Sequence, residues 1–304
     1  MSYSVEGKIV IAISSSALFN MKESNDIFEQ QGLKAYKEHQ NKNIDVPFDK
    51  GVAFPFVSRL LRINDELPLV RPIEVIMLSK NSPETGLRAF NSFKHYGLDI
   101  SRAVLSSGDT NFQYLPAFDA DLFLSSNEKD VKEALKLGYP AGRIVHSQID
   151  DDENPELRLA FDFDGVLADD ESEKVYKEQG MEEYRRYESS NKSEPLSPGP
   201  LEPLLKKISQ FQSIERDYNE KHPEYIPKIK TSIITARNAP AHERMIRTLN
   251  RWGIDVDVLF LLGGMDKDRI LSILKPHIFF DDQMIHLENI HAPAVHIPFG
   301  IANK

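Results

Sequence analysis

The sequence predicts an α/β protein with two tandem Rossmann-like lobes, each a parallel sheet with flanking helices, and three observations lead to this prediction. Residues 11–64 align without a gap on residues 159–212, and residues 105–127 align on residues 261–283, so the chain contains an internal duplication. In each copy, short apolar runs alternate with charged amphipathic stretches, which is the pattern of parallel strands joined by helical crossovers. A chain of 304 residues is also long enough for two domains of ordinary size.

The boundary between the copies is expected near residue 150. The stretch 150–155 is acidic and contains a proline, a composition that suits a domain boundary. We therefore predict a first lobe over residues 1–150 and a second lobe over residues 151–304. The second copy also carries additional residues of mixed charge within 215–230, which predict either a loop or an extended helix.

The elements are expected in the same order in both copies. An apolar run predicts a buried first strand, at 9–13 in the first copy and at 157–161 in the second. A charged stretch with helical spacing follows, at 24–40 and at 172–188, and leads through a loop rich in proline and glycine to another helix. Three further pairs of strands are predicted at 75–78 and 231–235, at 103–105 and 256–262, and at 121–124 and 277–280.

Acidic residues follow the strands of the second copy only. They are Asp162, Asp164, Asp281 and Asp282, and serines 14, 16, 125 and 126 stand at the corresponding positions of the first copy. Ligands of parallel sheets bind beyond the carboxyl ends of the strands, so we expect the four acids to meet there. Clustered carboxylates cost several kcal/mol unless a cation or protons offset their repulsion. An all-oxygen set without cysteine favours Mg²⁺ as that cation.

Two further positions supply groups that bind phosphate. Thr235 is predicted to end a strand and open a helix, so its hydroxyl and neighbouring N–H groups such as that of Ala236 suit phosphate oxygens. Lys267, after two glycines, supplies a positive charge to the same anion. The set predicts a phosphoryl-transfer site in which a carboxylate attacks phosphorus and water then hydrolyses the aspartyl-phosphate.

This ordered set resembles the haloacid-dehalogenase-like (HAD) phosphatase superfamily, whose four motifs are matched by Asp162-Phe163-Asp164-Gly165-Val166, Thr235, Lys267 and Asp281-Asp282. The resemblance implies that Asp162 is the nucleophile and that Asp164 is the general acid and, later, the general base. It also implies Mg²⁺ held by Asp162, the carbonyl of Asp164 and Asp282, with Asp281 acting through water. A helical cap is implied over an insert at about 169–230.

A second resemblance extends along nearly the whole chain. The chain is similar to the cytosolic 5'-nucleotidase I family in segments such as Asp45-Val46-Pro47-Phe48, Asn81-Ser82-Pro83-Glu84-Thr85-Gly86 and Phe280-Asp281-Asp282-Gln283. The resemblance implies a cytoplasmic enzyme, a possible homo-oligomer, that removes phosphate from nucleoside monophosphates, typically AMP and pyrimidine deoxynucleotides. Animal members have glycine between the two motif aspartates, where this chain has Phe163, so the base preference does not transfer.

Candidates for binding the substrate surround these motifs. Arg237 and Asn238 follow Thr235 and lie beside the expected phosphate, while Phe163 is predicted either to stack on a base or to pack in the core. Three tyrosines of the expected cap are assigned mainly to the core: Tyr176, Tyr184 and Tyr187. Three histidines near the C-terminus are expected to be surface or structural residues: His286, His291 and His296.

Composition narrows the possible functions. A net charge of −10 disfavours nucleic acid and anionic membranes as partners, and the absence of cysteine excludes disulfides and thiolate zinc sites. No stretch approaches the ~20 apolar residues of a membrane span, so a cytoplasmic protein is expected. Two alternatives to a 5'-nucleotidase remain: a phosphatase for another small phosphomonoester, such as a sugar phosphate, and a non-enzymatic nucleotide sensor.

The first copy has two candidate roles. The alignment sets Leu78 opposite Thr235 and Asn111 opposite Lys267, so this copy lacks the groups that would hold Mg²⁺ and phosphate in the same way. It is expected either to serve only as a packing partner or to bind a nucleotide effector. The effector cleft would be formed by residues 14–16, Asn81 and residues 125–127.

Overall fold

The two halves of the chain form one ten-stranded sheet in the computed structural model, which describes residues 3–67, 70–145, 151–152, 154–288 and 290–303. The first half supplies β1 (Ile9–Ile13), β4 (Ile73–Ser79), β5 (Arg102–Leu105), β6 (Leu122–Ser125) and β7 (Ala141–Val145). The second half supplies β8 (Leu157–Phe161), β9 (Ile229–Thr235), β10 (Val258–Leu261), β11 (Ile278–Asp281) and β12 (Ala294–His296). A separate two-stranded sheet pairs β2 (Phe19–Asn20) with β3 (Asp49–Lys50).

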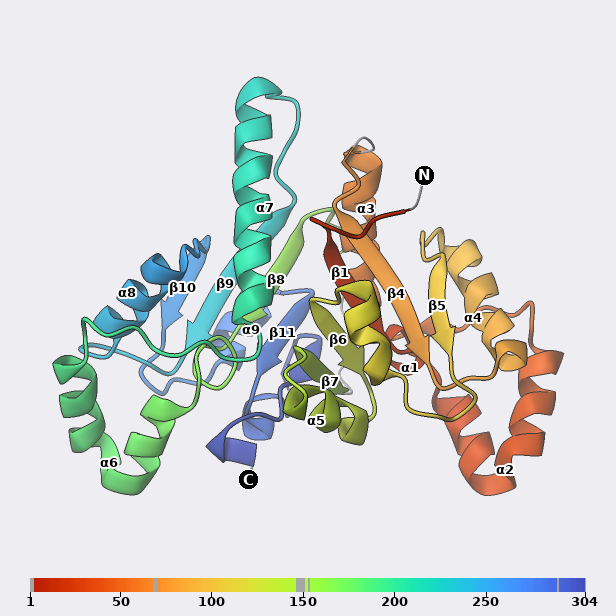
Figure 1. The fold of residues 1–304 in the computed structure, drawn as a ribbon, viewed down its shortest axis with the longest axis horizontal. Helices are drawn as coiled ribbons and strands as arrows, with labels where there is room; N and C mark the ends of the chain where they lie inside the picture. Colours follow the sequence, from red (N-terminus) through yellow and green to blue (C-terminus); the bar gives the residue numbers. More distant parts are fainter. Residues whose placement is uncertain (1–2, 68–69, 146–150, 153, 289, 304) are drawn as a thin grey trace.

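The sheet order shows how the halves join. It runs β10-β9-β8-β11-β12-β7-β6-β1-β4-β5, and every neighbouring pair is parallel except β12 and β7. Two parallel sheets therefore meet edge to edge through one antiparallel pair, β12 and β7. Figure 1 shows β11 of the second half and β6 and β7 of the first half near the middle of the molecule. The α/β class and the positions of the first strands are confirmed. The sequence patterns did not predict β7 or β12, because short apolar segments close to turn residues resemble loops until their partner strand is known.

The helices also repeat between the halves. They are α1 (Ser15–Leu18), α2 (Lys22–Lys42), α3 (Phe54–Glu66), α4 (Pro83–Tyr96), α5 (Glu128–Lys136), α6 (Glu171–Ser190), α7 (Glu202–Lys221), α8 (His242–Trp252) and α9 (Asp268–Leu274). The described residues also form three 3₁₀ helices: η1 (Phe112–Phe118), η2 (Met284–His286) and η3 (Ile301–Asn303). Both α2 and α6 are interrupted at a glycine with positive φ, Gly32 at 81° and Gly180 at 83°. Such angles are costly for residues with a side chain, which explains why glycine occupies both positions.

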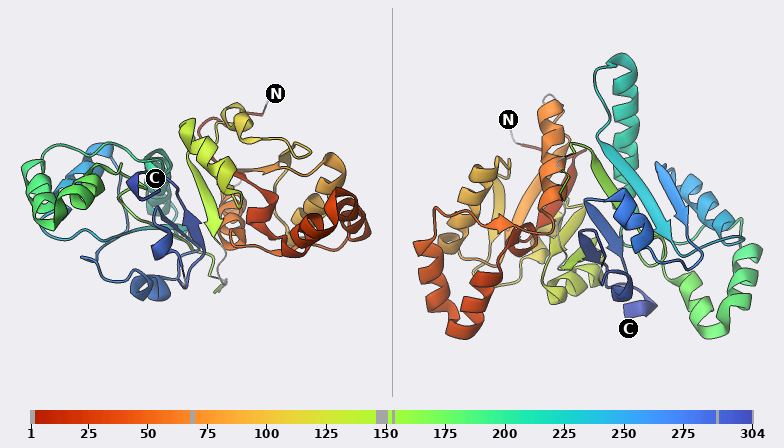
Figure 2. Two further views of the ribbon diagram at one scale, coloured as in Figure 1. Left: turned by 90° about the horizontal axis from the view of Figure 1, so that it is seen from below. Right: turned by 180° about the vertical axis from the view of Figure 1, so that it is seen from behind.

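Helices α2 and α6 project from the edge of the sheet where the strands end. Figure 1 shows them at the lower right and the lower left, and the view from below in Figure 2 places them at opposite ends of the molecule. Each helix follows the first strand of its half, β1 or β8. The acidic residues that follow β8 and β11 therefore lie at the edge from which α6 projects.

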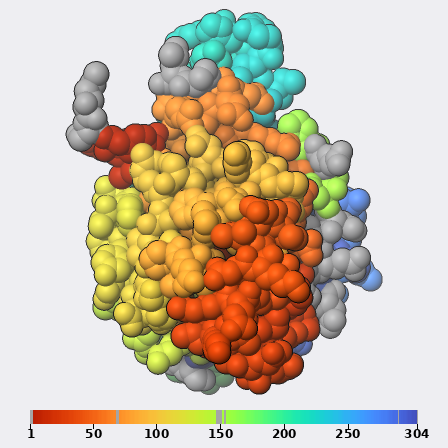
Figure 3. All heavy atoms as spheres, turned by 90° about the vertical axis from the view of Figure 1, so that its right-hand side faces the viewer, coloured from red at the N-terminus to blue at the C-terminus, as the bar shows by residue number. Residues whose placement is uncertain are grey.

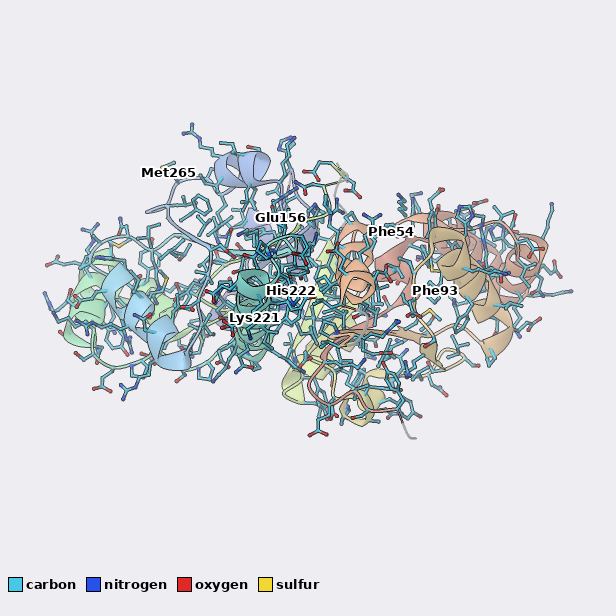
Figure 4. All side chains as sticks on the ribbon, turned by 90° about the horizontal axis from the view of Figure 1, so that it is seen from above. Phe54, Phe93, Glu156, Lys221, His222 and Met265 are labelled. Atoms are coloured by element: carbon cyan, nitrogen blue, oxygen red, sulfur yellow. The ribbon has the colours of Figure 1, made fainter. Side chains whose placement is uncertain are left out.

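One helix of the segment predicted as a cap packs against the sheet. The insert at 169–230 contains both α6 and α7, but α7 buries Leu204, Leu205 and Ile208 and packs against β1 of the other half. In return, α3 packs against β8, so α3 and α7 stand beside each other over the junction (Figures 1 and 3). Figure 4 shows from above the end of α7, with Lys221 and His222, close to α3 with Phe54. Helix α7 is therefore part of the packing between the halves, and the additional residues before β9 begin as an extension of α7.

The two halves share one hydrophobic core. It includes Ile11 and Phe56 from the first half and Phe161 and Phe280 from the second, with the rings of the last two stacked at 5.0 Å between centroids. Ion pairs also cross the junction, and they join Lys207 to Asp121 at 2.7 Å and Lys228 to Glu66 at 2.9 Å. Because the apolar contacts are continuous, we expect the halves to unfold together.

His277 makes the stability of this junction sensitive to pH. Its Nδ1 accepts the N–H of Arg158 at 3.0 Å, and burial, with the charges of Arg59 and Arg158, lowers its pKa to about 4. In the unfolded chain the histidine side chain binds a proton near pH 6.5, whereas in the folded chain it stays neutral down to about pH 4. The free energy of unfolding is therefore highest above pH 6.5 and decreases as the pH falls towards about 4. We expect a loss of about 2 kcal/mol, measured by denaturant unfolding over this range.

The variant His277→Asn tests this expectation. Asp121, at the equivalent position of the first half, accepts the N–H of Val10 through a carboxylate oxygen, so an amide oxygen suits the same bond. The variant should show a smaller loss of stability between about pH 6.5 and about pH 4 than the original chain. Equal pH dependence in the two proteins would contradict the assignment to His277.

Candidate active site

Three of the predicted acids converge because their strands are neighbours. Phe161 of β8 pairs with Phe280 of β11, so the residues that follow both strands emerge side by side. Asp162 donates its backbone N–H to the carbonyl of Phe280 at 2.8 Å. Asp281 and Asp282 are fully buried beside it, and Asp162 is also buried. The sheet thus holds three carboxylates in a small volume from which water is largely excluded.

Lys267 joins two of these carboxylates. Its Nζ lies 2.7 Å from Oδ2 of Asp162 and 2.6 Å from Oδ2 of Asp281. Burial acts to lower the pKa of the amine, but the two carboxylates outweigh burial and raise the pKa above its ordinary value. The side chain directly precedes α9, as the sequence predicted, and it supplies a fixed positive charge.

The two paired acids are neutralised unequally. Burial raises the pKa of Asp162 to about 7 despite the opposing charge of Lys267. The pKa of Asp281 is instead lowered, because Lys267 and His286 together outweigh its burial. Nδ1 of His286 lies 3.2 Å from both carboxylate oxygens of Asp281. Asp281 is therefore satisfied by protein groups, whereas the negative charge of Asp162 is only partly compensated.

Asp282 has the environment expected of a cation ligand. Both of its carboxylate oxygens are buried and have no hydrogen-bond partner among the described residues. Burial, followed by the charges of Asp162 and Asp281, raises its pKa to about 9. Gly165 has a φ of 73°, and a Cβ at that position would lie 2.4 Å from Oδ2 of Asp282. Unpartnered buried carboxylate oxygens cost several kcal/mol unless a cation or a proton binds, so the site fits a hard cation.

Two different sets of ligands are possible around this position. Ligand atoms of Asp162, Asp281 and His286 all lie within 4.8 Å of one another. The oxygens of Asp281 are, however, already occupied by Lys267, by His286 and by the N–H of Gln283. We therefore favour Asp282 over Asp281 as the ligand beside Asp162, because both oxygens of Asp282 lack a hydrogen-bond partner among the described residues.

Asp164 is held by Arg237. Nε and Nη2 of the guanidinium donate to the two carboxylate oxygens at 2.7 and 2.6 Å, and Nη1 donates to Glu188 of α6. Only 1% of the Arg237 side chain is exposed. The arginine was predicted to bind the substrate, but in this structure its guanidinium is committed to protein carboxylates. It is better described as the residue that orients Asp164.

The residues after β9 differ in part from the prediction. Thr235 is buried and its hydroxyl accepts the N–H of Arg237 at 3.1 Å, while Ala236 and Asn238 are exposed beside it. Thr235 does not open a helix, which is a correction, because α8 begins only at His242. The loop between them contains a cis peptide bond before Pro240. Phosphate would therefore meet the N–H groups of a loop rather than a helix terminus.

Phe163 points into the core. Its side chain is fully buried and stacks near Trp252, with 6.3 Å between the ring centroids. The guanidinium carbon of Arg237 lies 5.2 Å from the centre of the phenylalanine ring. Of the two alternatives predicted for Phe163, packing is the one this geometry supports, since a buried ring is not accessible to a base.

Two histidines near the site were not predicted to contribute. His286 contacts Asp281, and Nε2 of the buried His296 lies 3.0 Å from the carbonyl oxygen of Asp282. Their sequence spacing is too wide for one helix face, which made them resemble surface residues. A 3₁₀ turn directly after the paired acids brings His286 back to Asp281, and the short spacing between the two residues is the signal for this contact.

In the first half, hydroxyl groups take the place of the acids. Oγ of Ser16 contacts Oγ of both Ser14 and Ser126, so these side chains satisfy one another. The strand register corrects the predicted alignment, since Ser79, not the buried Leu78, occupies the place of Thr235. Ile13 pairs with Met77 just as Phe161 pairs with Ile233. Oγ of Ser79 also accepts the N–H of Asn81, as Thr235 does for Arg237.

The large, mostly parallel sheet flanked by helices, with buried acids and a lysine beyond the carboxyl ends of its strands, is consistent with a Rossmann-like fold of the HAD type. The chain belongs to the 5'-nucleotidase family, because the family model described as 5'-nucleotidase matches residues 1–304. It is 37% identical over 303 residues to human cytosolic 5'-nucleotidase 1B, with 97% of this chain and 49% of that protein covered. The chain thus spans about half the length of this curated relative.

One solved structure has a distant likeness to this chain. A short chain dehydrogenase from Mycobacterium smegmatis aligns with a TM-score of 0.22 and 7% identity, covering 87% of this chain and 95% of that chain. Among the residues that the structure describes, no helix is both long and apolar enough to cross a membrane.

Proposed function

We propose that this protein hydrolyses nucleoside 5'-monophosphates to nucleosides and phosphate, with Mg²⁺ as cofactor. The observation that carries the proposal is the buried cluster in which Lys267 joins Asp162 to Asp281, while the carboxylate oxygens of Asp282 have no hydrogen-bond partner in the part of the chain that the structure describes. Membership of the 5'-nucleotidase family supports the nucleotide as the substrate class. The 5'-nucleotidase is therefore preferred over the sugar-phosphate phosphatase and the nucleotide sensor.

The residues divide the chemistry as follows. An oxygen of Asp162 forms a bond to phosphorus while the bond from phosphorus to the 5'-oxygen breaks, and Asp164 gives a proton to the departing oxygen. Asp164 then takes a proton from a water molecule that attacks phosphorus, which releases phosphate and restores the Asp162 carboxylate. Thr235, the N–H of Ala236 and Lys267 hold the phosphoryl oxygens during both steps.

Mg²⁺ would be held by Asp162, Asp282 and the backbone carbonyl of Asp164, and it would offset the charge of the phosphate and of the clustered acids. The two unpartnered oxygens of Asp282 support this assignment. Asp281 would remain paired with Lys267 and act on the cation only through water. Without a cation, the anionic cluster opposes the approach of an anionic substrate, so activity should depend on Mg²⁺.

A phosphate-release assay tests the proposal. Nucleoside 5'-monophosphates and sugar phosphates are compared, with Mg²⁺ and with a chelator in its place. We expect phosphate release from nucleotides in Mg²⁺ only. Phosphate release from sugar phosphates alone would show that the substrates are sugar phosphates and not nucleotides. Nucleotide binding without phosphate release would indicate a sensor.

Three expectations about partners and location stay predictions. A nucleotide effector in the first half is one, although the serine hydroxyls there already contact one another. Self-association and a cytoplasmic location are the others. Titration with ADP or ATP tests the first, and sedimentation of the purified protein tests the second.

A further inference from the structure

A buried chain of ion pairs leads from α6 to Asp164. Glu188 has no exposed side-chain surface, and its Oε2 accepts a hydrogen bond from Nη1 of Arg237. The other nitrogens of that guanidinium hold Asp164. Glu188 is therefore separated from Asp164 by a single guanidinium group. Its second oxygen, Oε1, accepts from Ser172 at 2.7 Å and from Arg244 at 3.1 Å.

The first half contains the same framework without the charged pair. Gln40 stands at the place of Glu188, and its Nε2 donates to Ser24 at 2.8 Å, which corresponds to the bond between Ser172 and Glu188. Helix α2 keeps the kink of α6. A neutral amide therefore suffices to build this helix and anchor it.

A second set of contacts shows that the rest of the framework is equivalent. Nε of Arg88 donates to the carbonyl of Val46 at 2.8 Å, as Nε of Arg244 donates to the carbonyl of Glu194 at 2.9 Å. Asn81, however, stands at the place of Arg237. The duplication thus separates two kinds of residue: those kept in both halves support the fold, and the Glu188–Arg237 pair is present only where the catalytic acids are present.

We propose that Glu188 is a positioning residue that acts through Arg237 to hold the carboxyl group of Asp164 where, in its protonated form, it gives its proton to the leaving oxygen. The inference rests on the proposed function and assigns a task to a side chain that does not touch the substrate. A buried ion pair is costly to maintain, and removing one partner leaves the other charge uncompensated. With Glu188 neutral, Arg237 loses one of its two carboxylates, and Asp164 loses its fixed orientation.

This role can be separated from a general structural role by the leaving group. A 5'-alkoxide is a poor leaving group and needs a proton as its bond to phosphorus breaks, whereas a thiolate leaves without one. A defect in proton donation should therefore slow formation of the aspartyl-phosphate strongly from a nucleoside 5'-monophosphate and spare it from the analogue with sulfur at the 5'-bridging position. The later hydrolysis of the aspartyl-phosphate is the same for both compounds, so the comparison is made on kcat/KM. A defect in folding, metal binding or the nucleophile should slow both compounds alike.

The test uses Glu188→Gln in the full chain, which introduces the side chain that the first half already has at this place. Substrates are the best nucleoside 5'-monophosphate of the assay above and its 5'-bridging phosphorothiolate analogue. We expect kcat/KM, which reports the steps up to departure of the leaving group, to fall about 10- to 100-fold for the oxygen substrate and less than about 3-fold for the sulfur substrate. The ratio of the two rates is measured in one preparation, so it does not depend on the fraction of folded protein.

Two further variants complete the design. Asp164→Asn should show the same selective loss, and adding Glu188→Gln to it should reduce the rate by less than about 2-fold more, because both changes affect one step. The matched control Gln40→Glu should leave both rates unchanged. Equal loss on both substrates, or additive loss in the double variant, would overturn the positioning role. Failure of the original chain to hydrolyse any nucleotide would instead remove the proposed function and this inference with it.

Discussion

Replacing Asp162 by asparagine is expected to reduce phosphate release at least about 10³-fold while the protein stays folded. An amide oxygen is a poor nucleophile towards phosphorus, so no covalent intermediate would form. The fold should tolerate the change, because Oδ1 of Asp162 accepts the N–H of Phe163 at 2.7 Å and an amide oxygen can do the same. Lys267 would keep its contact with Asp281. Steady-state kinetics and thermal unfolding of the same samples measure both effects.

The internal duplication provides a matched control for this variant. Ser14 occupies the place of Asp162 in the first half, and its hydroxyl accepts the N–H of Ala17 at the start of α1. Ser14→Ala should cost about 1 kcal/mol of stability through loss of this helix cap and leave turnover unchanged. Substantial activity in Asp162→Asn would exclude the covalent mechanism, whereas lost activity in Ser14→Ala would show that the first half takes part in it.

The second large effect is expected from Asp282→Asn, which should abolish activity yet raise the stability of the metal-free protein. In the absence of a cation the folded chain must bury this carboxyl without a partner, and its pKa is raised to about 9. The neutral amide removes that cost, so thermal unfolding in a chelator should occur at a higher temperature than in the original chain. Addition of Mg²⁺ should then stabilise the original chain and have little effect on the variant.

The dependence on pH adds a second check. The unfolded carboxyl loses its proton near pH 3.9, whereas the folded carboxyl of Asp282 keeps it up to about pH 9. Stability of the metal-free original chain should therefore decrease as the pH rises across this range, and the advantage of Asp282→Asn should grow. A variant that is less stable than the original chain in chelator, and that still responds to Mg²⁺, would show that Asp282 is not a ligand of the cation.

Much of the site could be predicted from local patterns. The first strands end at Ile13 and Phe161 as expected. Asp162, Asp281 and Lys267 meet at the edge of the sheet where neighbouring parallel strands end. These predictions hold because strand length and apolar content are local properties and because the carboxyl ends of parallel strands share one edge. The 5'-nucleotidase family membership agrees with the resemblance seen in the sequence.

Other features depended on contacts between distant segments. Glu188 looked like one more acid of a charged helix, and only the fold shows that it is fully buried between Arg237 and Arg244. Arg237 looked like a group for the substrate because it follows Thr235, yet its partners lie on α6 and after β8. The residues adjacent in sequence do not show which charges are paired, because ion pairs form between helices and strands that are far apart in the chain.

The amino-acid sequence by itself determined the α/β class, the duplication, the half that retains the acids and the motifs that resemble those of phosphoryl-transfer sites. These follow from residue types, periodicity and spacing along the chain. The tertiary structure decided that β7 and β12 join the halves in one sheet, that Asp282 rather than Asp281 has free oxygens, and that α6 is coupled to Asp164. Each of these depends on burial and on distances between segments far apart in sequence, and only the folded chain sets those quantities.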